Sequence, residues 1–123
     1  MLEIHPLTDE EERRAFCAER GLPPGAAVLC ALENGGETGH AAMTIEGCGE
    51  DAVLTMHAWD YSEDDFTGEL LLRAVISYAF NRAVPTVSAP LSLRNALTDK
   101  VGFETREDGL WISTKNVVHF CQK

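Results

Sequence analysis

The stretch from Ala52 to Asn81 constrains the fold of this chain more than any other part. It opens with AVLTMHAWD, in which the Thr, His and Trp at positions 55, 57 and 59 alternate with the Leu, Met and Ala at positions 54, 56 and 58, as in a β-strand. After a polar loop the period becomes helical, because apolar residues recur on one face at Leu72, Val75, Ile76 and Ala79. A strand, a short loop and a helix therefore follow one another. In this arrangement the amides and the dipole at the helix N-terminus can bind an anion.

The loop before this helix is itself anionic. Glu63, Asp64 and Asp65 stand just ahead of the helix, where carboxylates interact favourably with its dipole. The pattern predicts Asp65 or Thr67 as the N-cap residue. An anionic ligand would compete with these carboxylates, and this conflict is the main functional question that the sequence poses.

Composition and charge exclude several classes of function. With 123 residues, 45% of them hydrophobic, the chain is expected to form a single domain over residues 1–123. The start resembles no signal peptide and no window is apolar enough to cross a bilayer, so we expect a cytoplasmic protein. The net charge of −10 repels phosphate backbones and anionic lipids within a Debye length of about 8 Å, which disfavours nucleic acid and membranes as partners. The 4 cysteines include no C-x-x-C pair and are expected to be reduced thiols.

Alternation, helical period and turn residues predict ten elements. Thr8, with Glu11 three residues later, is expected to cap the first helix, and Gly102 to end the last. The expected strands are residues 2–5, 26–32, 38–45, 52–59, 86–89, 103–113 and 117–122, and the expected helices are residues 8–20, 67–82 and 91–101. The order β-α-β-β-β-α-β-α-β-β predicts an α/β (α+β) fold with a mixed, mostly antiparallel sheet and helices on both faces.

Turn chemistry predicts how the central strands pair. Strands 26–32, 38–45 and 52–59 form an antiparallel meander, and strand 86–89 lies parallel to the third of them after a right-handed crossover. If Glu46 lies opposite Asp51, His40 lies opposite His57, and the two imidazoles titrate as a coupled pair. The alternative is a one-residue bulge, which puts the two histidines on opposite faces.

Two further stretches carry a family resemblance. LLRAVISYA at residues 71–79 and LTDKVGFE at residues 97–104, together with the element order, resemble the GNAT superfamily of acyl-CoA-dependent N-acyltransferases. The resemblance implies transfer of an acetyl group from acetyl-CoA to an amine of a small molecule or peptide. It places the pantetheine arm on the main chain of Met56, His57 and Ala58, with His57 as a candidate general base.

The departures from the family pattern fall on functional positions. The family's pyrophosphate loop, R/Q-x-x-G-x-G/A, is replaced by residues 63–68, with Glu63 at the cationic position and Phe66 at the first glycine. Thr67 and Gly68 complete the loop, and only Gly68 keeps the family's residue. We therefore expect acetyl-CoA binding to be weak or absent.

Other family features are missing as well. The family's acidic tyrosine is Thr98 here, its asparagine is Leu91, and one helix replaces two between the first two strands. Tyr61 or Tyr78 is an alternative acid. The second functional hypothesis is accordingly a GNAT-fold binding or assembly module that does not bind CoA.

Three residue groups keep an alternative interpretation. His57 is either a base or a hydrogen-bonded, partly buried strand histidine. The carboxylates at position 60 and positions 63–65 form either a solvated loop or a Ca²⁺ or Mg²⁺ site, although their spacing is not that of an EF-hand. The apolar run at 117–121 is either an interior strand or an edge that pairs in a homodimer.

Overall fold

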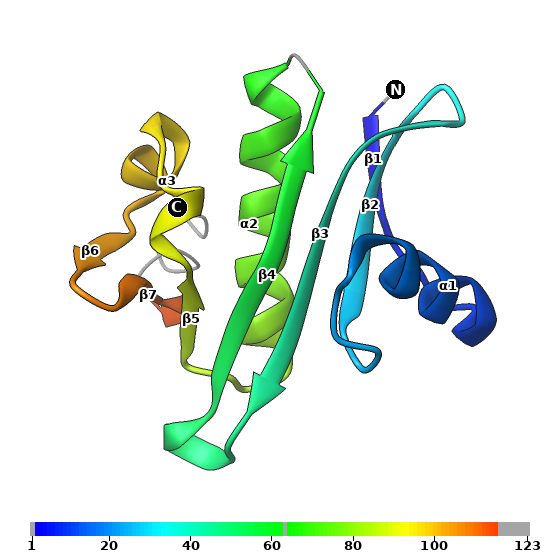
Figure 1. The fold of residues 1–123 in the computed structure, drawn as a ribbon. Helices are drawn as coiled ribbons and strands as arrows, with labels where there is room; N and C mark the ends of the chain where they lie inside the picture. Colours follow the sequence, from blue (N-terminus) through cyan, green and yellow to red (C-terminus); the bar gives the residue numbers. More distant parts are fainter. Residues whose placement is uncertain (1, 63, 116–123) are drawn as a thin grey trace.

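The computed structural model describes residues 2–62 and 64–115. They form one seven-stranded sheet in the order β1-β2-β3-β4-β5-β7-β6 (Figure 1). The strands are β1 Leu2–Pro6, β2 Ala27–Glu33, β3 Gly36–Glu46, β4 Val53–Tyr61, β5 Thr86–Ala89, β6 Glu104–Arg106 and β7 Gly109–Ser113. The helices are α1 Glu10–Arg20, α2 Asp65–Asn81 and α3 Ala96–Val101, with 3-10 turns η1 Gly49–Asp51 and η2 Leu91–Leu93.

This architecture confirms the predicted fold class and, from β1 to α3, the predicted element order. β1 to β4 pair in an antiparallel meander, and β5 pairs parallel to β4 as the crossover through α2 requires. It is the one parallel pairing among the described strands. None of the described helices is long and apolar enough to cross a membrane.

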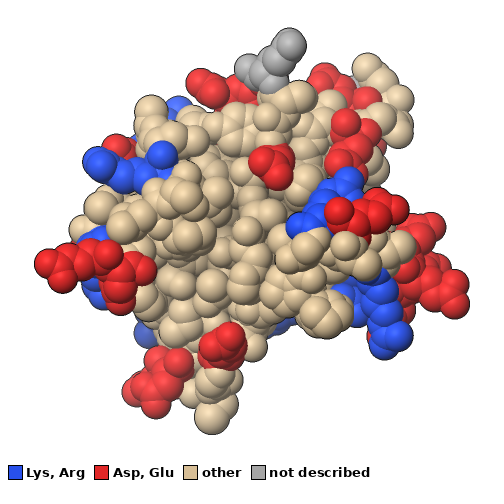
Figure 2. All heavy atoms as spheres, in the orientation of Figure 1, with Lys and Arg blue, Asp and Glu red and all other residues tan. Residues whose placement is uncertain are grey.

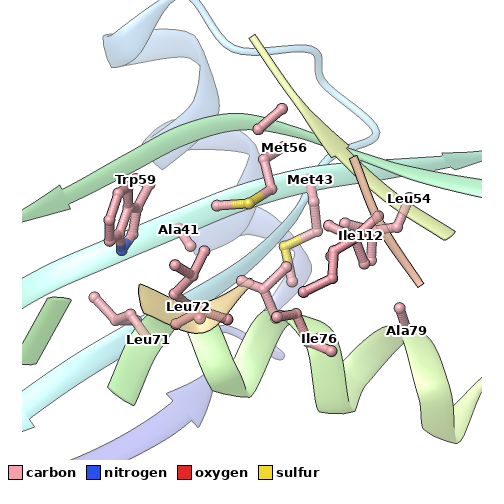
Figure 3. Packing of buried hydrophobic residues seen from close by; sticks show 14 of the residues in the cluster. Ala41, Met43, Leu54, Met56, Trp59, Leu71, Leu72, Ile76, Ala79 and Ile112 are labelled. Atoms are coloured by element: carbon pink, nitrogen blue, oxygen red, sulfur yellow. The ribbon is translucent and has the colours of Figure 1, made fainter. Parts of the chain in front are cut away.

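The main core lies between α2 and one face of the sheet (Figure 3). α2 contributes a stripe of side chains with no exposed surface, which are Leu71, Leu72, Val75, Ile76 and Ala79. Their main partners on the strands are Ala41, Met43, Leu54, Met56, Trp59 and Ile112. Burial of each large aliphatic side chain contributes about 1.5–3 kcal/mol relative to exposure, so this stripe decides where α2 lies.

α1 packs on the opposite face of the sheet. Phe16 and Cys17 of α1 form a second cluster with Val28, Cys30 and Ala42, which alternate along β2 and β3 with residues of the main core. The prediction of helices on both faces is therefore confirmed. α1 covers β2 and β3, whereas α2 spans the other face as far as β5.

Both predicted N-caps are wrong by one or more residues. Asp9, not Thr8, caps α1, because its Oδ1 accepts a hydrogen bond from the Glu12 amide at 3.0 Å. Asp64, not Asp65 or Thr67, caps α2. Several neighbouring residues are equally good caps by type, so propensity alone does not choose among them.

The predicted helix 91–101 and strand 103–113 are each divided in the structure. η2 ends at its C-cap Arg94, and Asn95 starts α3, because its side chain accepts from the amides of Leu97 and Thr98 at 2.8 and 3.2 Å. Residues 103–113 turn at positions 107–108, so β6 and β7 form a hairpin in place of one strand. The predicted strand 117–122 lies outside the described residues, and so does the proposed homodimer edge.

The predicted pairing of His40 with His57 is wrong. Glu46 lies opposite Val53, two residues beyond the expected partner, and His40 lies opposite Asp60. A register shift between Ala42 and Met43 adds one residue to β4, which is His57. The bulge that was the alternative interpretation is therefore present, but in a hairpin whose loop is longer than predicted.

Gly109 gives a test of the β5–β7 contact. Its φ is +151°, and a Cβ atom there would lie 2.8 Å from the Ala89 carbonyl oxygen. We expect Gly109→Ala to lower the free energy of unfolding by about 1–3 kcal/mol, because the substitution adds both backbone strain and a steric clash. Denaturant unfolding measures the loss, and Gly25→Ala is the control because no atom lies within 4 Å of its Cβ position. Equal stability of the two variants would contradict the assignment.

Candidate functional site

β4 and β5 separate in the middle of the sheet. Their parallel pairing joins Val53–Thr55 to Thr86–Ser88 and ends there, although β4 continues for six more residues. The separation opens a hollow of about 290 Å³, lined by Thr55, Met56, His57, Ser88, Ala89, Pro90, Asp108 and Trp111. Beyond this point the edge of β4 that faces β5 has no strand partner among the described residues, so a ligand can pair with its main chain.

A row of side chains crosses the sheet beside this hollow. Its members are register neighbours on four strands, in the order Thr44, Thr55, Ser88 and Trp111. They alternate with the core residues of α2's face, so they lie on the opposite face. α1 covers only the β2–β3 part of that face. Figure 2 shows this side, where charged side chains gather mainly around the edge.

His57 lies at the mouth of the hollow. Its side chain is exposed, and its Nε2 lies 2.8 Å from Thr44 Oγ1. In the tautomer in which Nε2 donates to Thr44, Nδ1 carries a lone pair and can accept a proton. Met56 is buried and Ala58 packs against the α1 cluster, so only main-chain groups of these two residues suit a ligand.

The amides at the start of α2 are already hydrogen-bonded. Asp64 Oδ1 accepts from the Phe66 amide at 2.9 Å, and the Asp64 carbonyl accepts from the amides of Thr67 and Gly68 at 3.0 and 3.3 Å. Thr67 is buried, whereas Phe66 is 63% exposed and stands at the tip of the helix. Glu63 lies outside the described residues.

Gly68 is required by an aromatic contact. A Cβ atom at this position would lie 2.7 Å from the ring of Tyr61. The indole of Trp59 packs against Tyr61, with ring centroids 5.1 Å apart, and donates a hydrogen bond to the Gly68 carbonyl at 3.0 Å. The two rings thus fill the space between the end of β4 and the first turn of α2.

Polar contacts then tie this corner to α3. The Tyr61 hydroxyl accepts from Asn95 Nδ2 at 3.1 Å, and Lys100 Nζ donates to Glu69 at 2.8 Å. Hydrogen bonds from Lys100 and Arg73 lower the pKa of Glu69. This carboxylate therefore stabilises the fold above its ordinary pKa, and the contribution is lost as the pH falls through the lowered value.

The comparisons with known proteins are structural. Neither a family model nor a curated protein sequence matches the chain. An N-acetyltransferase from Staphylococcus aureus superposes with a TM-score of 0.70 at 13% identity, over 93% of this chain and 98% of that one. A Desulfovibrio desulfuricans structure assigned to the GNAT family of acetyltransferases gives 0.67 at 13% identity, over 93% and 99%.

The chain has the GNAT fold. N-acetylglutamate synthase from Neisseria gonorrhoeae, solved with coenzyme A and N-acetyl-glutamate, shares this fold with a TM-score of 0.66 at 13% identity. The match covers 93% of this chain and 35% of the synthase. At these identities the comparison establishes the GNAT fold alone, and any activity has to be inferred from the residues of the site.

The residues expected from the GNAT resemblance fall into two places. Met56, His57 and Ala58 lie on β4 beside the hollow, whereas Phe66, Thr67 and Gly68 lie at the tip of α2. The two alternative general acids lie in different places. Tyr61 packs on Gly68, whereas the ring centroid of Tyr78 lies 3.5 Å from the guanidinium carbon of Arg82, farther along α2. Thr98, which the resemblance places at the family's tyrosine position, is buried in the capping box of α3.

The acidic residues that the structure describes do not gather into a metal site. Asp60 lies 3.4 Å from His40 Nε2, and Glu37 lies 3.6 Å from His40 Nδ1. In the part of the chain that the structure describes, no three His, Cys, Asp or Glu side chains are placed to hold a metal ion. Burial raises the pKa of the nearby Cys30 to about 11, so this thiol stays protonated at neutral pH.

Sequence reasoning missed four residues of the site. Thr44, Ser88, Asp108 and Trp111 join His57 only when the strands are in register. The alternation of residues 86–89 could have placed Ser88 on the face away from the core. No pattern could have placed Asp108, because its turn lay inside a segment predicted to be one strand.

The contact between Gly68 and Tyr61 can be tested by a double-mutant cycle. Gly to Ala inside a helix normally stabilises by about 1 kcal/mol. We expect the opposite sign for Gly68→Ala, a loss of about 1–3 kcal/mol, because the new methyl group clashes with the ring. In a Tyr61→Leu background the same substitution should become neutral or stabilising, as measured by thermal unfolding. A stabilising effect in the parent would contradict the contact.

Proposed function

We propose that this protein is a GNAT-type N-acetyltransferase, which transfers an acetyl group from acetyl-CoA to an amine of a small molecule or peptide. The observation that carries the proposal is the separation of β4 from β5, with His57 at the mouth of the hollow between them. The main chain of Met56, His57 and Ala58 offers the unpaired strand edge that a thioester arm needs. Coenzyme A in the synthase of the same fold supports this choice of donor.

The chemistry requires one base. An ammonium acceptor must lose a proton before its nitrogen can attack the thioester carbonyl, and His57 Nδ1 accepts that proton. As the C–N bond forms and the C–S bond breaks, the nitrogen loses its second proton to water, and sulfur leaves as a thiolate and takes a proton from water. Thr44 holds the imidazole through Nε2 and so acts as a positioning residue.

The contacts at the tip of α2 disfavour binding of acetyl-CoA. The first amides of α2 are satisfied by Asp64, and the loop before them is acidic. A carboxylate about 4–6 Å from a phosphate, at an effective dielectric near 20, costs on the order of a few kcal/mol before salt screening. We therefore expect low affinity for acetyl-CoA at physiological salt.

A second candidate function follows from the contacts at the tip of α2. Tyr61 packed on Gly68, and Asp64 bonded to the first amides, leave little of a phosphate site at α2. A GNAT-fold binding or assembly module that does not use CoA fits these contacts. Titration with acetyl-CoA separates the two functions.

The first test concerns His57. We expect His57→Gln to lower kcat/KM for acetylation of an amine by about 10²–10⁴-fold, the usual range for loss of a general base. Thr44→Val should lower kcat/KM less, because it removes only the hydrogen bond that orients the ring. Release of free thiol from acetyl-CoA measures the rate. His5→Gln is the matched control, since His5 is an exposed histidine on β1, and equal rates for both histidine variants would contradict the role.

The second test concerns the acidic loop. We expect Glu63→Arg with Phe66→Gly to raise acetyl-CoA affinity at least tenfold, or about 1.4 kcal/mol, because a repulsion becomes an attraction and the backbone becomes accessible. Calorimetric titration at two salt concentrations measures the gain and its salt dependence. Glu19→Arg makes the same charge change on exposed α1 and should leave affinity unchanged. Micromolar binding by the parent would show that the loop does not hinder the cofactor, and no binding by either protein would favour the module.

A further inference from the structure

We propose that Asp108 and Trp111 hold a positively charged group of the acceptor, so that the substrate is a diamine or another amine with a second cationic group. The inference rests on the proposed acetyl transfer and identifies its substrate class. It begins from the hollow between β4 and β5, in which these two side chains share the lining with His57.

The charge of the hollow favours a cation. Asp108 is the one residue with a full charge at neutral pH among those that line it, apart from the titratable His57. Asp108 Oδ1 accepts a hydrogen bond from Trp111 Nε1 at 3.1 Å, which fixes the carboxylate and the indole relative to each other. The second carboxylate oxygen can accept from an ammonium group that lies beside the ring.

Trp111 already attracts one cation in this structure. The guanidinium carbon of Arg106 lies 5.5 Å from the ring centroid, within the range of a cation–π contact. Trp111 also lines the neighbouring hollow with Arg106, so the indole lies between the two. Glu104 accepts hydrogen bonds from Arg106 at 3.2 and 3.3 Å and is its main anionic partner. Asp108 interacts with Arg106 only through a longer-range electrostatic attraction, so its second carboxylate oxygen can accept from a ligand.

The substrate needs two basic groups, because one end of the hollow removes a proton from its ligand and the other end binds a group that stays protonated. The nucleophilic nitrogen must lose a proton, and this occurs at His57. A group bound by Asp108 and Trp111 keeps its proton, because both a carboxylate and an aromatic face favour the charged form. The net charge of −10 also raises the local concentration of dications over monocations.

The kinetic test compares 1,4-diaminobutane with 1-aminopentane, which has a similar length and lacks the second charge. We expect kcat/KM to be at least tenfold higher for the diamine. Asp108→Asn should lower the diamine value at least tenfold more than the monoamine value, and Trp111→Leu should also lower the diamine value more than the monoamine value. Glu107→Gln, at the neighbouring turn position outside the hollow, should change neither.

A binding test separates this inference from the proposed function. Calorimetric titration with 1,4-diaminobutane, without acetyl-CoA, should give at least tenfold weaker binding to Asp108→Asn than to the parent or to Glu107→Gln. This result supports the cation site even if no acetylation is detected, in which case the proposed function fails alone. Equal diamine affinity in Asp108→Asn and the parent, no binding by the parent, or equal kcat/KM for the two amines overturns the cation site.

Discussion

The burial of the apolar stripe of α2 against β3 and β4 determines where every part of the site lies. Leu72, Val75 and Ile76 lose all contact with water when the helix lies on the sheet. With α2 fixed in this way, its N-terminus stands beside the end of β4, and its C-terminus delivers the chain to β5. The crossover leaves β5 paired with only the first part of β4, and the hollow follows from that partial pairing.

The tip of α2 shows a conflict between packing and ligand binding. Trp59 and Tyr61 fill the corner that the first turn of the helix shares with β4, and Gly68 has no side chain because a ring occupies the space. The glycine that the family resemblance places in a phosphate loop is thus a packing residue in this structure. A residue type at a family position can persist for either physical reason, and only the contacts around Gly68 distinguish them.

Much of the fold could be predicted from periodicity. The alternation in residues 52–59 and the helical period after Gly68 are strong local signals, and a parallel strand after that helix has one preferred handedness. The details that failed depend on competition between near-equal local choices. Asp9 and Thr8 are both good caps, and Asn95 could continue a helix or start a new one.

The candidate site was less predictable because its geometry depends on register. His57 was identified from the sequence, but its neighbours were not, since a single extra residue in β4 moves every later side chain to the other face. Ser88 and Trp111 come from strands that are far apart along the chain. Their juxtaposition is a property of the sheet and of no local motif.

The row Thr44, Thr55, Ser88 and Trp111 has a consequence for folding. Each member belongs to a different strand, and the row spans 68 positions of the chain, counted from 44 to 111. Contacts of such long sequence separation form late, after the entropy of loop closure has been overcome. A partly folded chain that has formed α2 and the β3–β4 hairpin still lacks Ser88 and Trp111, which are half of the row. Any ligand that contacts both ends of the row therefore binds only the fully assembled sheet, and its binding free energy adds directly to the cooperativity with which the last strands dock.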